Sequence, residues 1–393
     1  MAQIKKQNKE STMKTENNPL ANLLELPVVE PWPEPVDGKL LLDELARLLE
    51  RFVVLPPWAA DTMALWVLHT YAFKCRDVST YLGIESPVKR CGKTTLLTVL
   101  SEVANRVIVS SNISSPAFYR VIEEKQPTLL IDEADTLLPG NDELRGILNA
   151  GYRLKTAYVV RVSNQEKEVK DSRSGAETRG SRLVSFSCWC PKAIASIGHL
   201  PDTLADRCIL IRMERKSPGQ KCERCRNLDA TILKRKCARF VLDHGPAIAS
   251  ANPEIPASLN DREADIWEPL LALSDLAGAD WPNRARQAAV GLAGRAVENN
   301  PISSLLSDID AAFRTLKVNR IFSRTLVAEL NKLTGRPWAE GRNGKEATEQ
   351  WLSRALRPHG IRPGSLRMGE AVAKGYLRRD FEKAFQLHLP NKM

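Results

Sequence analysis

Ser86-Pro-Val-Lys-Arg-Cys-Gly-Lys-Thr-Thr95 is the stretch of sequence that decides the fold of this chain. It follows an apolar strand pattern and opens a helical pattern, which is the context of a phosphate-binding loop. Gly92 lets the backbone approach a phosphate chain, and Lys93 reaches the outer phosphates. The hydroxyl of Thr94 supplies a ligand for Mg²⁺, and the start of the helix adds partial positive charge. The loop therefore predicts a nucleoside triphosphate site.

The loop departs from the usual G-x-x-x-x-G-K-[ST] pattern at its entry. Pro87 stands at the position of the first glycine, and proline fixes φ and lacks an N–H. This departure is expected to alter the entry geometry and the affinity of the loop. For Cys91, an oxidation-sensitive thiol and a packing role are both open. The nucleotide-binding residues expected here are Pro87, Lys89, Cys91, Gly92, Lys93, Thr94 and Thr95.

A Gly-Lys-Thr string also occurs by chance in basic loops, so a second motif is needed. Residues 128–135 read Thr-Leu-Leu-Ile-Asp-Glu-Ala-Asp, an apolar strand that ends in acids. Asp132 is expected to hold Mg²⁺, directly or through water, and Glu133 to act as the general base on the attacking water. Asp135 is expected to pack at the strand exit. The ordered pair of motifs predicts an ATP hydrolase with Mg²⁺ as cofactor.

Strand and helix patterns alternate around the two motifs. Such alternation favours an α/β fold with a parallel sheet and crossover helices. Five strands are expected, at residues 78–84, 106–110, 128–132, 183–188 and 208–213, with helices at 94–104 and 116–124.

Up to residue 300 the sequence is expected to divide into three parts. Residues 1–37 read as a disordered tail and a Pro-rich lead-in. The ATPase core is placed at residues 38–215, and it starts with a helix at residues 40–52. Helices at 228–244, 264–276 and 282–297 are expected to form a helical lid over residues 216–300.

Charge and cysteine content bear on partners and location. The chain has 57 basic and 47 acidic residues, a net charge of +10, which favours a polyanionic partner. Eight cysteines in a chain of this size, with no signal peptide expected, are typical of free thiols in the cytoplasm. The apolar stretch at residues 63–73 is too short to cross a bilayer, so no membrane role is expected.

The last quarter of the chain carries most of the net positive charge. Residues 301–393 contain 17 Lys or Arg and 9 Asp or Glu, so 17 − 9 = +8. Helices at 305–316, 324–333 and 349–356, then an extended pair and a helix at 379–387, predict a winged-helix-like α+β domain. Ser323 and Thr348 stand where helix N-caps belong.

The motifs resemble those of AAA-type P-loop ATPases. The strings SPVKRCGKTTLL (86–97), PTLLIDEADTLL (127–138) and LPDTLADRCILIRMERK (200–216) are similar to phage, plasmid and integrative-element proteins that carry domain of unknown function 3631. The resemblance runs from about residue 32 to the C-terminus. It implies a DNA helicase or translocase that acts in replication of a mobile genetic element. It also implies a homo-oligomeric ring, expected to be a hexamer, with ATP sites between subunits.

The resemblance also assigns roles to arginines. Arg207 occupies the place of an arginine finger that reaches the neighbouring subunit's site, although an ordinary surface arginine would look the same. Arg284 and Arg286 are both candidates for a lid arginine that reads the γ-phosphate. A polar sensor at the end of the fourth strand stays unassigned, because residues 187–192 lack the familiar asparagine.

Two regions are candidates for contact with DNA. In replicative AAA-type helicases a hairpin before the fourth strand grips DNA, and residues 158–182 resemble it, with a solvated loop as the alternative. Arg354 and Arg357 lie on the third C-terminal helix, where a groove contact and a protein-docking role are both open. The remaining cations are Arg161, Lys167, Lys170, Arg173, Arg179 and Arg182 in the first region, and Arg362, Arg367, Lys374, Arg378 and Arg379 in the second.

Two rival functions fit the same sequence motifs. The first rival is an ATP-gated switch or loader that recruits a partner protein, in replication or anti-phage defence, without unwinding DNA. The second is a DNA-binding initiator with a vestigial ATPase, which an intact Glu133 disfavours.

Cys222 and Cys225 suggest zinc, but Cys237 and His244 lie seven residues apart on one expected helix, about 10 Å along its axis. No structural metal is therefore expected.

Overall fold

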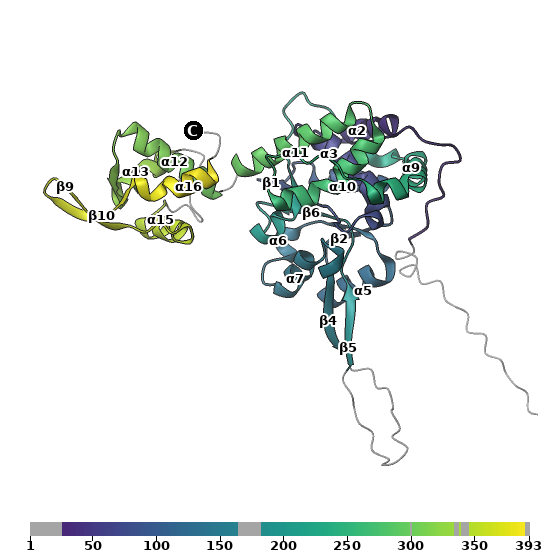
Figure 1. The fold of residues 1–393 in the computed structure, drawn as a ribbon, viewed down its shortest axis with the longest axis horizontal. Helices are drawn as coiled ribbons and strands as arrows, with labels where there is room; N and C mark the ends of the chain where they lie inside the picture. The colour runs from purple at the N-terminus through teal and green to yellow at the C-terminus, as the bar shows by residue number, and fades with distance from the viewer. Residues whose placement is uncertain (1–25, 164–181, 299–300, 334–337, 339–345, 390–393) are drawn as a thin grey trace, which may run out of the picture. The chain divides into compact units, whose positions relative to one another are not determined.

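The computed structural model describes residues 26–163, 182–298, 301–333, 338 and 346–389 (Figure 1). The chain divides into two compact units, Met1–Leu292 and Ala293–Met393, and each is described by itself.

A five-stranded parallel sheet forms the centre of the first unit (Figure 1). The strand order is β2-β3-β6-β1-β7. After β1 the chain crosses to β2 at the edge of the sheet, and the later strands β6 and β7 pair with β1 on either side. Every residue of β1 is buried, as expected for a strand covered on both faces. The parallel five-stranded sheet of the prediction is thereby confirmed. The strands are β1 (Tyr81–Ser86), β2 (Val107–Ser110), β3 (Thr128–Ile131), β6 (Lys192–Ile197) and β7 (Cys208–Arg212).

Two hydrophobic clusters cover the two faces of this sheet. Side chains alternate along a strand, and accordingly Leu82 and Ile84 join one cluster while Tyr81 joins the other. The first cluster contains α4 and the helices outside the sheet region, and the second contains α5 and α7. The connecting helices are α4 (Lys93–Val103), α5 (Ser115–Lys125), α6 (Ala134–Leu137), α7 (Asp142–Ala150) and α8 (Asp202–Ala205).

Helices from both ends of the first unit share one core. The two helices before the sheet pack against those after it, and Trp66, Trp267 and Trp281 are fully buried between them. None of the described helices is long and apolar enough to cross a membrane. These helices are α2 (Gly38–Phe52), α3 (Ala59–Ala72), α9 (Thr231–Ser250), α10 (Asp261–Ala277) and α11 (Trp281–Glu298).

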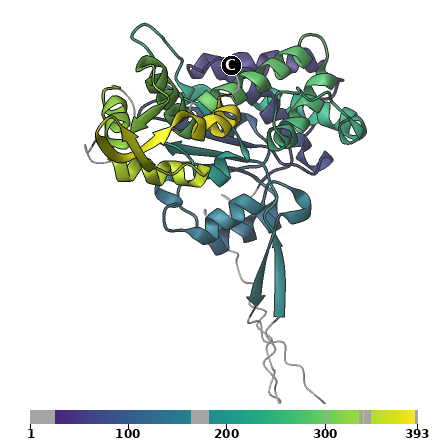
Figure 2. The ribbon, with the colours of Figure 1, turned by 60° about the vertical axis from the view of Figure 1, so that its left-hand side comes forward.

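The prediction of residues 183–188 as a core strand is wrong. They lie in β5 (Arg182–Ser187), which pairs with β4 (Tyr158–Ser163) in an antiparallel hairpin separate from the main sheet. Figures 1 and 2 both show this hairpin projecting away from the sheet. The fourth core strand is β6 instead. It begins with Lys192, a residue type that is normally exposed but is fully buried here.

The burial of Lys192 has a local explanation. Its Nζ donates to the Tyr81 hydroxyl at 2.9 Å and to the carbonyls of Cys188 and Cys190 at 3.0 Å each. A buried ammonium group is tolerated when its donors are satisfied in this way. These contacts tie the root of the hairpin to strand β1.

In its described residues, the second unit has helices before and after a three-stranded antiparallel sheet. The sheet order is β8-β10-β9, and Phe313, Tyr376 and Phe381 pack at its core. The predicted N-cap Thr348 is confirmed, since its hydroxyl accepts from the Trp351 N–H at 3.2 Å. The elements are α12 (Pro301–Thr315), β8 (Arg320–Phe322), α13 (Ser323–Asn331), α15 (Glu349–Leu356), β9 (Gly364–Met368), β10 (Ala371–Leu377) and α16 (Glu382–His388).

One predicted cap differs. Ser323 is the first residue of α13, and the N-cap is Phe322, which offers no side-chain acceptor. The side chain of Ser323 is buried, so core packing rather than capping determines its environment.

Candidate functional site

The loop between β1 and α4 lies at the carboxyl edge of the parallel sheet, where open α/β sheets bind ligands. Gly92 caps α4 with φ of 85°, a left-handed conformation that favours glycine. Cys91 is buried, and its Sγ lies 3.2 Å from the carbonyl of Val88. Of the two roles left open for this thiol, the contacts favour packing within the loop.

Lys93 closes the loop onto the end of β1. Its Nζ donates to the Ser86 hydroxyl at 2.5 Å, and that hydroxyl donates to the carbonyl of Val88 at 2.8 Å. Residues 87–90 of the loop are exposed, so open backbone lies close in the chain to the Lys93 ammonium group. This arrangement places a fixed positive charge beside backbone that can approach an anion.

Thr94 and Asp132 bring the two sequence motifs together. The Thr94 hydroxyl donates to Asp132 Oδ2 at 3.1 Å, although 38 residues separate them along the chain. Hydroxyl and carboxylate oxygens are the ligands that Mg²⁺ prefers, so this pair fits the ion. Thr95 is exposed on the same first turn of α4.

The two other acids of the second motif differ in their environment. Glu133 is exposed in a left-handed conformation with φ of 56°, which turns the chain away directly after Asp132. Asp135 does more than pack, because its Oδ1 accepts from the Ile197 N–H at 2.9 Å. It thus ties the segment after β3 to the end of β6.

Arg207 lies directly before β7. Its guanidinium donates to the carbonyl of Thr203 and lies 5.3 Å from the ring centre of Tyr152. Within one chain its polar contacts are therefore to its own turn. Lys89 and Pro87 are exposed on the loop, and the carbonyl of Lys89 accepts from Arg215 Nε at 3.3 Å.

The two arginines predicted to belong to a lid bond to carboxylates of the surrounding helical region. Arg284 pairs with Asp43 at 3.0 Å and with Asp61. Burial lowers the pKa of Arg284, but these two partners raise it above its ordinary value. Arg286 pairs with Asp275 at 2.7 Å. Among the described contacts, neither guanidinium is brought to the phosphate loop.

A buried acid that sequence reasoning missed lies at the end of β1. Glu85 is 3% exposed, and its Oε1 accepts from the Leu200 N–H at 2.9 Å. Its Oε2 lies 3.2 Å from His199 Nδ1 and 3.3 Å from Arg212 Nε. Burial opposes ionisation, but the bonds from His199 and Leu200 hold the pKa of Glu85 below its usual value. A glutamate inside the otherwise apolar strand pattern was the available signal.

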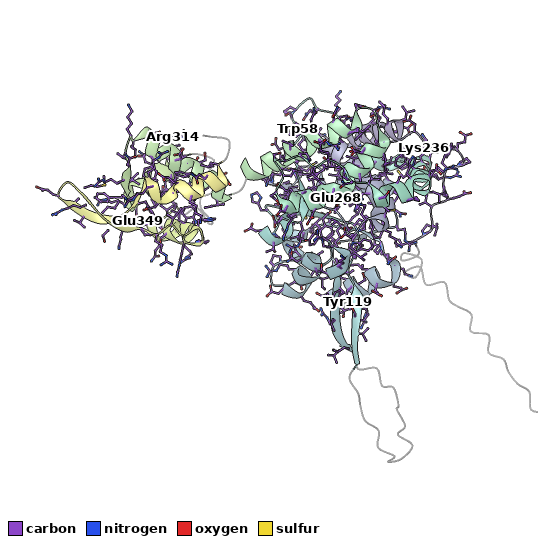
Figure 3. All side chains as sticks on the ribbon, in the orientation of Figure 1. Trp58, Tyr119, Lys236, Glu268, Arg314 and Glu349 are labelled. Carbon is purple, nitrogen blue, oxygen red and sulfur yellow. The ribbon has the colours of Figure 1, made fainter. Side chains whose placement is uncertain are left out.

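Of the six cations predicted for the hairpin region, the structure describes the side chain of Arg161. Arg161 pairs with Glu143 at 2.5 Å and lies 5.2 Å from the ring centre of Tyr119. Figure 3 labels Tyr119 near the root of the hairpin. The outward face is apolar instead. Lys167, Lys170, Arg173 and Arg179 lie outside the described residues, and the side chain of Arg182 is not described. The exposed apolar residues of the hairpin are Tyr158, Val160, Val162 and Leu183.

Most predicted cations of the second unit are exposed, but one is not available. The half-buried Arg378 pairs with the buried carboxylate of Asp310 at 2.8 Å, so its charge is already engaged within the unit. Arg314, four residues after Asp310, pairs with the same carboxylate at 2.7 Å. The predicted cations that are exposed are Arg354, Arg357, Arg362, Arg367, Lys374 and Arg379.

Comparisons with known proteins give one family and several loose structural similarities. The family model described as "Protein of unknown function (DUF3631)" matches residues 212–388. The "Uncharacterized 28.9 kDa protein in xis 5'region" of Saccharopolyspora erythraea is 34% identical over 188 residues, which are 46% of this chain and 69% of that protein.

Two solved structures are similar at low identity. The NrS-1 C-terminal region is 13% identical with a TM-score of 0.37, over 90% of this chain and 78% of that one. The structure titled "SCCmec type IV Cch - active helicase" is 11% identical with a TM-score of 0.34, over 88% of this chain and 69% of that one.

Proposed function

This chain belongs to the DUF3631 family of proteins of unknown function, and from that premise and the geometry of its site we propose that it is an ATP-hydrolysing AAA-type motor that acts on DNA. The biological setting that we propose is replication of a mobile genetic element. The motor is a homo-oligomeric ring, most simply a hexamer, with ATP bound between subunits.

The hydrogen bond between Thr94 and Asp132 is the observation that carries this proposal. It joins the phosphate loop to the acidic strand end, as ATP hydrolysis requires. Lys93 and the loop backbone bind the phosphates, and the exposed carboxylate of Glu133 takes a proton from the attacking water. Mg²⁺, when held by Thr94 and Asp132, supplies charge neutralisation at the phosphate oxygens. Arg207 is proposed to act in the neighbouring subunit's site.

The second unit is proposed to be a winged-helix module that contacts duplex DNA. Its order of helices and strands supports this assignment, with α15 as the groove helix and the β9–β10 pair as the wing. Arg354 and Arg357 on or just after α15, and Arg367 and Lys374 on the wing, are exposed. Exposed cations on two adjacent elements fit a contact with phosphates.

One experiment tests the motor directly. The ATPase rate is measured without DNA, with single-stranded DNA and with duplex DNA, while light scattering gives the mass of the particle. A DNA-stimulated ATPase in an oligomer is the expected result, with Lys93→Ala as the inactive control. An ATPase that DNA does not stimulate, in a monomer, would refute the motor.

The apolar outward face of the hairpin favours a second candidate. Apolar side chains exposed together on one face are typical of protein docking rather than phosphate contact. An ATP-gated loader that recruits a partner protein would hydrolyse ATP and fail to displace a DNA strand. A strand-displacement assay therefore separates the two candidates.

A further inference from the structure

The loop between β1 and α4 has bonded carbonyl groups and open amide groups. The carbonyl of Val88 accepts from the Cys91 thiol at 3.2 Å, and the carbonyl of Lys89 accepts from Arg215 Nε at 3.3 Å. In the part of the chain that the structure describes, the backbone N–H groups of residues 88–92 have no hydrogen-bond acceptor. Backbone donors and acceptors of this loop are thus treated differently by the side chains around it.

The backbone conformation of the loop fits an anion. Arg90 and Gly92 are both left-handed, with φ of 67° and 85°, and Cys91 lies between them. Left-handed residues next to ordinary ones turn successive N–H groups toward one side, which makes a concave site for an anion. A left-handed conformation is unfavourable for arginine, so contacts elsewhere in the loop have to stabilise it.

The side chains that bond to the loop carbonyls have fixed positions. Arg215 lies three residues after β7, and the Met213 N–H donates to the carbonyl of Glu85 at 2.7 Å, which ties this segment to the end of β1. Cys91 is 5% exposed. These bonds are found in a loop whose entry residue is Pro87, with a fixed φ and no N–H, where the usual pattern has glycine.

We propose that Arg215 and Cys91 are positioning residues of the proposed phosphate loop: by holding two carbonyls, they keep the N–H groups of residues 88–92 directed at the phosphates of the nucleotide. Neither side chain contacts the nucleotide itself. This inference rests on the proposed function, because it assigns further residues to the same site. A carbonyl released toward a phosphate would repel it, so loss of either bond weakens the binding of triphosphate and diphosphate alike.

Titration calorimetry with ATP and with ADP, on the full chain, tests the role of Arg215. Arg215→Ala is expected to weaken the binding of both nucleotides about tenfold, as for the loss of one hydrogen bond from a charged donor. Its kcat at saturating ATP is expected to stay within about twofold of the wild type, because the residues proposed for the chemistry are intact. Lys216→Ala is the matched control, since it removes the same charge from the next residue, which is also exposed, and should leave both affinities unchanged.

The thiol is tested in the same way. Cys91→Ala is expected to weaken both nucleotides about threefold, and Cys91→Ser to restore them, because a hydroxyl also donates. Cys208→Ala is the matched control, because Cys208 is likewise 5% exposed and its Sγ lies 3.2 Å from the carbonyl of Leu204, at the start of β7. Combining Arg215→Ala with Cys91→Ala should cost less than the product of the separate effects, since both act on one loop.

Several results would overturn the proposal. A loss of ATP binding without a loss of ADP binding in Arg215→Ala would mean direct contact with the γ-phosphate, and an equal loss in Lys216→Ala would mean an effect of charge alone. Wild-type affinities in Arg215→Ala and Cys91→Ala, in a protein whose nucleotide binding is abolished by Lys93→Ala, refute the positioning role only. A wild type that binds no nucleotide refutes the proposed function and this inference together.

Discussion

Lys93 and Glu133 have different tasks in the proposed site, so their substitution separates binding from chemistry. Lys93→Ala removes the charge that faces the phosphates and is expected to abolish nucleotide binding. Glu133→Gln keeps binding but lowers turnover by about 10²- to 10⁴-fold, because only the general base is lost. Binding by fluorescence anisotropy and phosphate release from the same preparations measure the two effects. Equal turnover in the wild type and Glu133→Gln would refute the assignment.

The ion pair of Glu85 and His199 predicts a pH window of stability. The pKa of His199 is raised, so its contribution is complete below the ordinary histidine value near 6.5 and is lost as pH rises through the raised value. The pKa of Glu85 is lowered, so its contribution is complete above the ordinary value and is lost as pH falls through the lowered one. The contribution of this pair to stability is therefore greatest between the ordinary pKa values of glutamate and histidine, 4.5 and 6.5.

Urea unfolding across the pH range checks this window. Glu85→Gln is expected to lower the free energy of unfolding near neutral pH and to flatten its dependence on pH at both ends. A control variant on α9, His244→Gln, should keep the wild-type dependence. A Glu85→Gln variant with a wild-type pH profile would show that the pair contributes nothing to the fold.

At the scale of elements, the root of the hairpin depends on one glycine after α7. A Cβ on Gly151 would lie 2.4 Å from the carbonyl of Cys188 and 2.8 Å from the Tyr81 hydroxyl. Gly151→Ala must displace this backbone and is expected to lower the free energy of unfolding by about 1–3 kcal/mol. Gly146→Ala, within α7 and with open space around it, is expected to raise it by up to about 1 kcal/mol. Denaturant unfolding of the two variants would contradict this account if their order were reversed.

The two elements proposed to contact DNA can be compared in the full chain. Replacing Arg354 and Arg357 with alanine is expected to weaken duplex binding more than replacing Arg367 and Lys374, if α15 enters the groove. Arg378 is unsuitable for such a test, because its loss would leave the buried Asp310 without one of its cations. The salt dependence of binding, with a slope of about −0.9 per phosphate neutralised, measures how many DNA phosphates each variant still neutralises. Full duplex affinity in both variants would favour the protein-docking alternative.

At the scale of the whole molecule, the ring proposal depends on Arg207. Within one chain this arginine bonds to its own turn, so a catalytic role requires a neighbouring subunit. Arg207→Ala is expected to lower turnover by about 10³- to 10⁵-fold without loss of ATP binding. Mixing it with Lys93→Ala should partly restore hydrolysis, because some interfaces then combine an intact loop with an intact finger. Intact oligomers without any rescue would show that Arg207 does not act between subunits.

The elements that could be predicted from the sequence are those that depend on short, contiguous runs of residues. The loop between β1 and α4, the acidic end of β3 and the helix α15 with its Thr348 cap depend on the order of neighbouring residues. Spacing within a helix or strand decides which of its side chains share a face, so these elements could be located without knowledge of their neighbours. The two motifs predict Thr94 and Asp132 as ligands of Mg²⁺, and the structure brings their side-chain oxygens to 3.1 Å from each other.

Contacts between distant parts of the chain select the strand that fills the central sheet and the polar groups that are buried beside it. Residues 183–187 and the strand β6 have similar apolar patterns, yet the first projects in a hairpin and the second is central. Strand β6 was not predicted because it begins with Lys192, a residue type that is normally exposed. Its burial is possible because acceptors far away in the sequence, such as the Tyr81 hydroxyl, bond to its ammonium group. The polar cluster around Glu85 and the carboxylates around Arg284 likewise join residues that are far apart in the sequence. The physical reason is that burial and charge pairing depend on what covers each side chain, and residues far apart in the sequence supply that cover.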